Sequence, residues 1–176
     1  KICIRKKPDM IIVVGDVNST IACTITAKKL AIKVAHVEAG LRSRDMSMPE
    51  EINRLCTDVL CDYLFTTDHF ANENLKREGI PEEKIFFVGN VMIDTLMKHK
   101  KAAAKVDLVS RFGLEPGKYA TLTLHRPSNV DDKNILQGIL EVLSQITKKL
   151  PIVFPIHPRT RKMAELFGLS HYFSNG

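Results

Sequence analysis

The sequence predicts an α/β fold built on doubly wound, parallel sheets. Short apolar runs rich in β-branched residues recur along the chain, stretches of helical length follow them, and Gly, Pro, Asn and Asp separate them. Such alternation is typical of parallel strands joined by right-handed helical crossovers. With 44% hydrophobic residues among 176, the chain can bury a core as one domain or as two small ones.

The first half of the chain shows this alternation most clearly. Met10–Val14 is a continuous apolar run between turn residues, which predicts a strand covered on both faces. A helix is expected from about Ser19 to Leu30, with Asn18 or Ser19 as its N-cap. After a strand at Val34–Val37, Pro49 opens a helix that runs towards Cys61, since proline is favoured in the first helical turn. The series continues with a strand at 63–66, a helix at 70–78 and a strand at 85–88.

Gly89 and Asn90 interrupt the pattern, so we predict two half-domains, residues 1–89 and 90–176. A basic helix is expected from about Val91 to Lys105. Its Lys98–Lys101 run is interpreted as a solvated helix face, with attraction of a phosphate as the alternative. The second unit is predicted to contain a strand at 119–124, a helix at 133–149 and a strand at 152–156.

Charge and composition narrow the classes of function. The chain carries 26 basic and 20 acidic residues, a formal charge of +6, which fits either nucleic acid or a polyanionic small molecule such as a nucleotide. Only 6% of residues are aromatic and none is Trp, so surfaces for stacking bases are scarce and no nucleic-acid partner is expected. No apolar run approaches the roughly 20 residues that span a bilayer, which predicts a soluble protein without a membrane partner.

The four cysteines show neither a CxxC pair nor the spacing of a metal site. We interpret them as reduced thiols in the core of a cytoplasmic protein, and we expect no bound metal. They are Cys3, Cys23, Cys56 and Cys61.

Reactive side chains follow the predicted strands at the points where the strands end. Asp16 and Glu38 follow the first two strands, while His125 with Arg126, and then His157, follow the strands of the second half. Ligands of open parallel sheets bind beyond the carboxyl ends of the strands, so we expect these side chains to meet in a cleft between the two halves. Carboxylates and a histidine together can remove a proton and return it.

Each acidic candidate also has an ordinary structural interpretation. Asp16 could belong to a helix-capping turn, and Glu38 could form an ion pair with Arg42. Glu50 and Glu51 could be first-turn acids that the helix dipole favours. A lone histidine often has only a structural role. The residues alone leave these alternatives open.

Five motifs of the chain match, in order, those of the non-hydrolysing UDP-N-acetylglucosamine 2-epimerases. The chain resembles this family over practically its whole length, and the strings HVEAGLRS and MPEEINR are specific. The motifs are Gly15–Thr20, His36–Ser43, Met48–Arg54, Val88–Asn90 with Ile93–Asp94, and Thr123–Arg126.

The resemblance implies a glycosyltransferase-B-like architecture of two Rossmann-like domains with the active site between them, both incomplete in this chain. It implies an isomerase that interconverts UDP-N-acetylglucosamine and UDP-N-acetylmannosamine for surface polysaccharide. In the family mechanism, UDP is eliminated to give 2-acetamidoglucal and is added again with the opposite configuration at C2. No metal or nicotinamide cofactor is expected, and family members are commonly homodimers.

The resemblance also assigns catalytic positions. Asp16, Glu38, Glu50 and His125 match them. The three acids are candidates for moving the C2 proton, and His125 is a candidate for stabilising or protonating the departing UDP. The division of roles among the acids stays open.

Further matches concern binding. Arg126 and His157 match positions that bind the substrate, or the second UDP-N-acetylglucosamine that activates bacterial members, and Arg42 and Arg44 are assigned to the same set. The chain departs from the family at Ser128, where an acid is usual. The opening βα unit of the family and its later UDP-binding segment are absent. We therefore expect the 176 residues to be a piece of a longer protein and to be inactive alone.

Two other functions compete with the epimerase. A glycosyltransferase of similar architecture would transfer a sugar to an acceptor instead of changing C2. A nucleotide-sugar-binding regulatory module would keep the cleft but lack the full set of acids. The four catalytic matches favour the epimerase.

Overall fold

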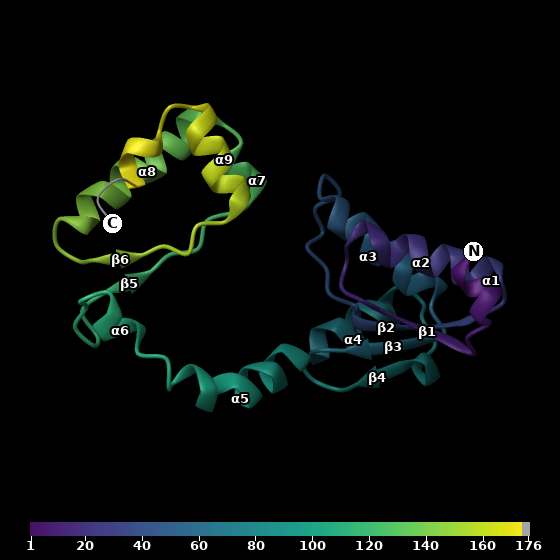
Figure 1. Ribbon diagram of the computed structural model, residues 1–176. Helices are drawn as coiled ribbons and strands as arrows, with labels where there is room; N and C mark the ends of the chain where they lie inside the picture. Colours follow the sequence, from purple (N-terminus) through teal and green to yellow (C-terminus); the bar gives the residue numbers. More distant parts are fainter. Residues whose placement is uncertain (174–176) are drawn as a thin grey trace. The chain divides into compact units, whose positions relative to one another are not determined.

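The computed structural model describes residues 1–173, which form two compact units (Figure 1). The first unit is Lys1–Ala103 and the second begins at Ala104. The predicted division at residues 89 and 90 falls at the start of helix α5 (Val91–Ala103), which belongs to the first unit.

The first unit is built on a four-stranded parallel sheet. Its strands are β1 (Met10–Val14), β2 (Lys33–Ala39), β3 (Tyr63–Thr66) and β4 (Ile85–Phe87), in the spatial order β1-β2-β3-β4. The predicted α/β class and parallel pairing are confirmed. Within residues 1–173 the strand order runs without the reversal that a doubly wound sheet contains.

Helices connect these strands as the sequence predicts. They are α2 (Asn18–Lys29), α3 (Pro49–Leu60) and α4 (His69–Arg77), with the short α1 (Ile2–Lys6) before β1 and the 3-10 turn η1 (Glu82–Lys84) before β4. In Figure 1, α2 and α3 lie along one face of the sheet. Right-handed crossovers in a sequential strand order place the connecting helices on one side, so the opposite face has fewer neighbours.

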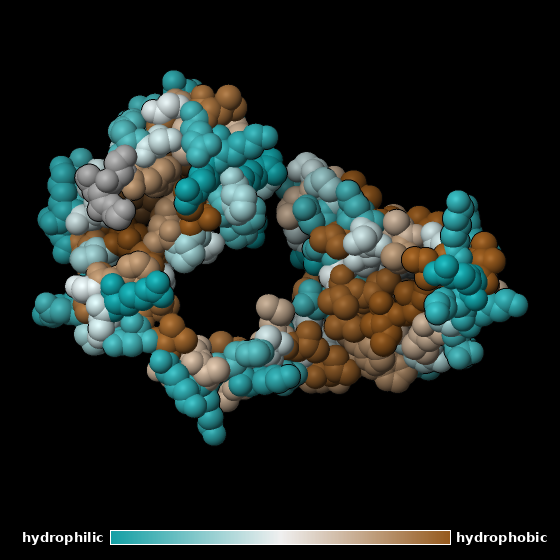
Figure 2. Space-filling view, in the orientation of Figure 1, coloured by the Kyte–Doolittle hydropathy of each residue, from teal (hydrophilic) through white to brown (hydrophobic). Residues whose placement is uncertain are grey.

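Burial along β1 shows the consequence of this arrangement. Val13 is buried, but the side chains of Ile12 and Val14, which point to the other face, are 64% and 55% exposed. The prediction that this strand is covered on both faces is therefore wrong for the structure as described. Figure 2 shows hydrophobic residues gathered over the sheet of this unit.

The start of α2 also differs from the prediction. Neither Asn18 nor Ser19 caps the helix, because the N-cap position is Val17, which offers no side-chain oxygen. Thr20 instead donates a hydrogen bond from Oγ1 to the carbonyl of Val14 at 2.9 Å, which ties the first turn of α2 to the end of β1. The Asn18 side chain accepts a hydrogen bond from Asn53 of α3 at 3.0 Å. The start of α2 is therefore held by contacts with β1 and α3, without a capping side chain.

The second unit contains a two-stranded parallel sheet with helices packed on it. Leu136 and Leu140 bury the apolar side of its longest helix, which Asp132 caps by accepting hydrogen bonds from two backbone amides. The strands are shorter than predicted, since only residues 120–121 pair with residues 152–153. The elements are α6 (Leu108–Arg111), β5 (Ala120–Thr121), α7 (Pro127–Val130), α8 (Lys133–Thr147), β6 (Ile152–Val153), α9 (Pro158–Leu166) and the 3-10 turn η2 (Ser170–Phe173).

The cysteines are all free, but only one lies in the core. Cys61 is buried in the first unit, and burial, followed by the charges of Asp58 and Asp62, raises the pKa of its thiol to about 12. Cys23 and Cys56 are exposed. The predicted core location is therefore right for Cys61 and wrong for those two. Among the described residues, no helix combines the length and the apolarity needed to cross a membrane.

Candidate active site

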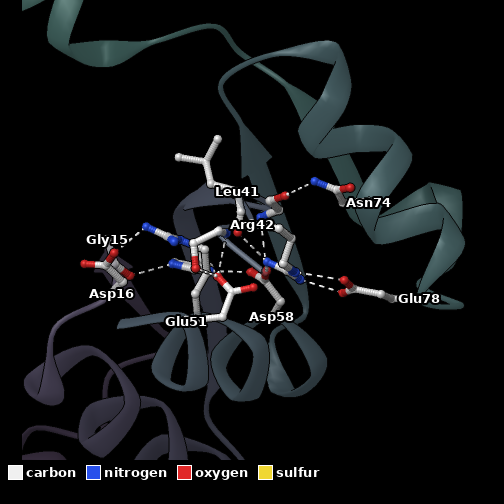
Figure 3. A network of polar contacts seen from close by, with 12 residues as sticks. Gly15, Asp16, Leu41, Arg42, Glu51, Asp58, Asn74 and Glu78 are labelled. Atoms are coloured by element: carbon white, nitrogen blue, oxygen red, sulfur yellow. Dashed lines mark hydrogen bonds and ion pairs between the residues drawn. The ribbon is translucent and has the colours of Figure 1, made fainter. Parts of the chain in front are cut away.

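The carboxyl end of β1 carries Gly15 and Asp16, of which β2 holds Gly15 and α3 holds Asp16. Gly15 has a φ of +68°, which glycine adopts without steric cost, and its N–H donates to the Val37 carbonyl at 3.0 Å. The backbone carbonyl of Asp16 accepts a hydrogen bond from the Asn53 side chain at 2.9 Å, and the Asp16 carboxylate forms an ion pair with Arg54 (Figure 3). Asp16 does not cap α2, so the capping alternative does not explain it.

Glu38 lies next to this turn, at an irregularity of β2. The pairing of β2 with β3 shifts register between Val37 and Ala39, and Glu38, between them, has a φ of +69°. Non-glycine residues in this left-handed region are strained, and such strain is concentrated at functional sites. A methyl group on Gly15 would lie 3.7 Å from Glu38 Oε2, so the Glu38 carboxylate reaches the backbone next to Asp16. The fold therefore brings the first two predicted acids together.

Arg42 has a different place from the one predicted. Its side chain is only 4% exposed and lies between two carboxylates, those of Asp58 at 2.7 Å and Glu78 at 2.5 Å (Figure 3). Burial lowers the pKa of the Arg42 guanidinium, but the hydrogen bond with Glu78 and the charge of Asp58 outweigh it, so the pKa lies above its ordinary value. Arg42 is thus part of the interior, which argues against its predicted contact with substrate and against the ion pair with Glu38.

The two acids at the start of α3 have opposite environments. Glu51 is buried and accepts hydrogen bonds from the backbone N–H groups of Ser43 and Arg44, at 2.8 and 3.0 Å, and from the Ser43 hydroxyl at 3.0 Å. Glu50 is exposed. The Arg44 side chain is also exposed, with one hydrogen bond of 3.4 Å to Asn74. Glu50 and Arg44 are therefore accessible to a ligand, while Glu51 holds the loop that precedes α3.

The second unit brings its own predicted residues together. The rings of His125 and His157 have centroids 5.5 Å apart, and both side chains are exposed. His125 Nδ1 lies 3.2 Å from the Thr123 hydroxyl, and His157 caps α9 by accepting a hydrogen bond from the Arg159 N–H at 3.2 Å. Arg126 is the exposed N-cap residue of α7. Two imidazoles and a guanidinium near helix N-termini form an arrangement that favours anions.

Sequence reasoning missed a buried pair beneath the first group of residues. His36 and Asp58 are both fully buried, and His36 Nδ1 lies 2.6 Å from Asp58 Oδ1. The signal was present in α3, because Glu51 and Asp58 are seven positions apart and share a helix face that is buried despite being polar. No group of three or more His, Cys, Asp or Glu among residues 1–173 is arranged to hold a metal ion.

Comparison with known proteins decides the family. A sequence profile described as UDP-N-acetylglucosamine 2-epimerase matches residues 1–174. The chain belongs to this family. The family's UDP-N-acetylglucosamine 2-epimerase from Methanocaldococcus jannaschii is 47% identical over 176 residues, which cover 96% of this chain and 48% of that protein. The family resemblance predicted from the motifs is confirmed.

Other epimerases agree with this assignment. The crystal structure of the M. jannaschii enzyme in complex with UDP-GlcNAc and UDP matches with a TM-score of 0.87 at 45% identity, over 99% of this chain and 49% of that one. A UDP-2,3-diacetamido-2,3-dideoxy-D-glucuronate 2-epimerase from Pseudomonas aeruginosa is 43% identical over 172 residues, covering 96% of this chain and 47% of that protein. This chain thus spans about half the length of these epimerases.

Proposed function

We propose that this member of the family, at the length of its relatives, inverts C2 of a UDP-linked N-acetylated sugar, interconverting UDP-N-acetylglucosamine and UDP-N-acetylmannosamine. The observation that carries the proposal is the juxtaposition of Glu38 and Asp16 at the carboxyl ends of β2 and β1 in a chain that belongs to the epimerase family. Two carboxylates at this edge of the sheet suit the removal and return of a proton.

The proposed reaction has two steps. In the first, a carboxylate takes the proton from C2, the C1–O bond breaks, and UDP leaves with the bonding electrons as a C1=C2 double bond forms in 2-acetamidoglucal. In the second, C2 receives a proton on its opposite face and a UDP oxygen forms the new bond to C1. We assign proton transfer at C2 to Asp16, Glu38 and Glu50, and assistance to the leaving UDP to His125.

Binding of the nucleotide is assigned to the second unit. The exposed Arg126 guanidinium and the imidazoles of His125 and His157 suit the diphosphate, because they present N–H donors beside helix N-termini. Arg44 is kept as a further candidate, since its side chain is exposed. Arg42 is not a candidate for binding the nucleotide, because carboxylates enclose its side chain.

A second substrate is favoured by one observation. The relative that is 43% identical is named for UDP-2,3-diacetamido-2,3-dideoxy-D-glucuronate, and its identity is close to that of the relatives named for UDP-N-acetylglucosamine. The chemistry at C2 would be the same. The two substrates differ at C3 and C6, so they are distinguished by offering each one separately.

Proton NMR tests the proposal. The full-length protein is incubated in deuterated water with UDP-N-acetylglucosamine, and we expect the manno epimer to form with deuterium at C2. We expect Asp16→Asn or Glu38→Gln to slow turnover by about 10²–10⁴-fold, the range for removal of an acid–base group. Glu83→Gln, which changes an exposed acid in η1, serves as the control.

Three outcomes separate the alternatives. An unchanged sugar, in a folded protein that binds UDP, would contradict the epimerase and favour a binding module. Transfer of the sugar to an added acceptor would favour a glycosyltransferase. The 176 residues alone are expected to give no product under the same conditions, and detectable turnover by them would contradict that expectation.

A further inference from the structure

We propose that the buried His36 and Asp58 are positioning residues that hold the carboxylates of Glu38 and Asp16 in their reactive arrangement. The inference deepens the proposed function and rests on it. Neither side chain has any exposed surface, so neither touches a substrate. Their influence on the reaction is therefore indirect, through the backbone on which the two acids are mounted.

His36 connects the acid-bearing turn after β1 to helix α3. Its Nε2 lies 2.8 Å from the carbonyl oxygen of Gly15, the residue before Asp16, and its Nδ1 lies 2.6 Å from Asp58 Oδ1. His36 stands in the middle of β2, paired with Val13 of β1 and Leu64 of β3, so the backbone that carries its ring is fixed on both sides. The ring thus links three elements at one point.

Asp58 extends the connection to the other acid. Its second oxygen, Oδ2, accepts a hydrogen bond from the Gly40 N–H at 3.0 Å and pairs with Arg42 at 2.7 Å. Gly40 follows Glu38 by two residues, directly after the irregularity that turns Glu38 towards Gly15. The Asp58 carboxylate therefore anchors the backbone next to both reactive acids. It holds Gly15, beside Asp16, through His36, and it holds Gly40, near Glu38, directly.

The partners of the His36 ring determine its protonation. A carbonyl oxygen faces Nε2 and a carboxylate oxygen faces Nδ1, and both are acceptors. A neutral imidazole has only one N–H, so with an ionised Asp58 the ring must carry two protons. Arg42 and the Gly40 amide both donate to Asp58 Oδ2, so that oxygen is occupied as an acceptor and Asp58 needs no proton of its own to satisfy these contacts.

The charges of this arrangement balance. An imidazolium at His36 and the Arg42 guanidinium face the carboxylates of Asp58 and Glu78, so these four side chains carry two charges of each sign. Balanced pairing is what makes buried charges tolerable, and removal of one member leaves another uncompensated. The network is therefore stiff, which is the property needed to hold Glu38 at a strained φ. Displacing a reacting group by about 1 Å can cost a factor of about 10² in rate.

The first test measures the protonation of the His36 ring. Nitrogen-15 NMR of the His36 imidazole in the full-length protein at neutral pH is expected to show both ring nitrogens protonated. In Asp58→Asn, the amide can donate to Nδ1, so only Nε2 is expected to keep its proton. A wild-type ring with a single proton would overturn the proposed arrangement, whether or not the protein proves to be an epimerase.

The second test measures kcat and KM of variants at His36. We expect His36→Phe, which keeps a ring without a donor, to lower kcat at least 30-fold per folded molecule and to leave KM within about threefold, because the proposed diphosphate contacts lie in the second unit. His36→Gln keeps an N–H that can reach Gly15, and it is expected to recover part of the lost kcat. Normal kcat in folded His36→Phe would overturn the proposal.

A matched control separates positioning from general stability. Asp62 forms an ion pair with Lys28, in which the two side chains are 30% and 32% exposed, and it accepts the Val34 N–H at 2.8 Å, but it has no hydrogen bond to Gly15 or Gly40. Asp62→Asn is expected to lower the melting temperature with kcat unchanged. Equal losses of kcat in Asp62→Asn and His36→Phe would overturn the positioning role. Absence of turnover in the wild type would instead contradict the proposed function. The nitrogen-15 NMR measurement of His36 would then still test the proposed arrangement of His36 and Asp58.

Discussion

Neighbouring residues of the same type have different roles in this protein. Glu50 and Glu51 are adjacent in the first turn of α3, yet one is exposed and the other is enclosed by three donors of the preceding loop. A helix turns by 100° per residue, so consecutive side chains face different surroundings. Glu51, which holds the loop, and Glu50, which is accessible to a ligand, are thus adjacent in the sequence.

The environment of Glu51 predicts a dependence of stability on pH. Burial raises the pKa of its carboxyl, but the hydrogen bonds from Ser43 and Arg44 and the charge of Arg42 outweigh burial and hold the pKa below its ordinary value of 4.5. As the pH falls, Glu51 is therefore protonated at a higher pH in the unfolded state than in the folded state. The contribution of Glu51 is complete above pH 4.5 and is lost as the pH falls through its folded-state pKa.

Glu51→Gln tests this dependence by urea unfolding. The amide retains one acceptor and places an NH₂ against backbone donors, so we expect a loss of about 1–3 kcal/mol in the free energy of unfolding at pH 7. The difference from wild type should shrink as the pH falls below 4.5 and through the folded-state pKa of Glu51, because wild type then also loses the carboxylate. Glu50→Gln is the matched control and should leave the free energy of unfolding nearly unchanged. An equal loss at pH 7 and below the folded-state pKa would contradict the assignment.

At the scale of elements, the end of β2 and the start of α4 pack backbone against backbone. Gly40 has a φ of +80°, and a methyl group on its Cα would lie 2.5 Å from the carbonyl oxygen of Ala71. Asn74 of the same helix donates to the Gly40 carbonyl at 3.0 Å. The close approach positions the chain directly after Glu38, so glycine is required here by packing as well as by conformation.

Gly40→Ala is expected to cost about 2–5 kcal/mol in the free energy of unfolding, since it combines left-handed strain with a clash against fixed backbone. Gly79→Ala is the control, because Gly79 has a φ of +81° but no atom within 4 Å of the added methyl group. Strain alone should cost about 1 kcal/mol there. Chemical denaturation of both variants measures the difference. Losses of equal size would show that the contact with Ala71 does not matter.

At the scale of the whole molecule, the last helix of the first compact unit has little packing. None of the residues of α5 (Val91–Ala103) is buried, and its Lys98–Lys101 run is exposed, in agreement with the predicted solvated face. By contrast, α4 buries Ala71 and Leu75. Segments with few buried contacts open at low free-energy cost, so α5 should open before the helices of the cores.

Limited proteolysis tests this expectation. Trypsin is expected to cut the 176-residue chain first between Lys98 and Lys105, giving two fragments that resist further cleavage. The control sites are Lys76 and Arg77, which are also exposed but lie on the packed α4. Mass spectrometry of the early fragments locates the first cut. Cleavage at Lys76 or Arg77 before α5 would contradict the predicted order.

The sequence alone was sufficient for features that depend on local pattern. The bounds of β1 and β3 and the start of α3 at Pro49 agree with the predictions, because apolar runs, turn residues and the fixed φ of proline act over a few neighbours. Strands β5 and β6 came out shorter than predicted, since a strand requires a paired neighbour as well as β-branched residues. The family was also determined by sequence, because its motifs are strings of consecutive residues.

Tertiary structure alone decided which side chains meet. Arg42 could equally pair with Glu38 or contact substrate on sequence grounds, and only packing against Asp58 and Glu78 places it in the interior. His36 and Asp58 are 22 positions apart, and their contact depends on the register of β2 and the docking of α3. Hydrogen bonds are directional and short, so they follow from the arrangement of whole elements in space, which no local pattern of residues encodes.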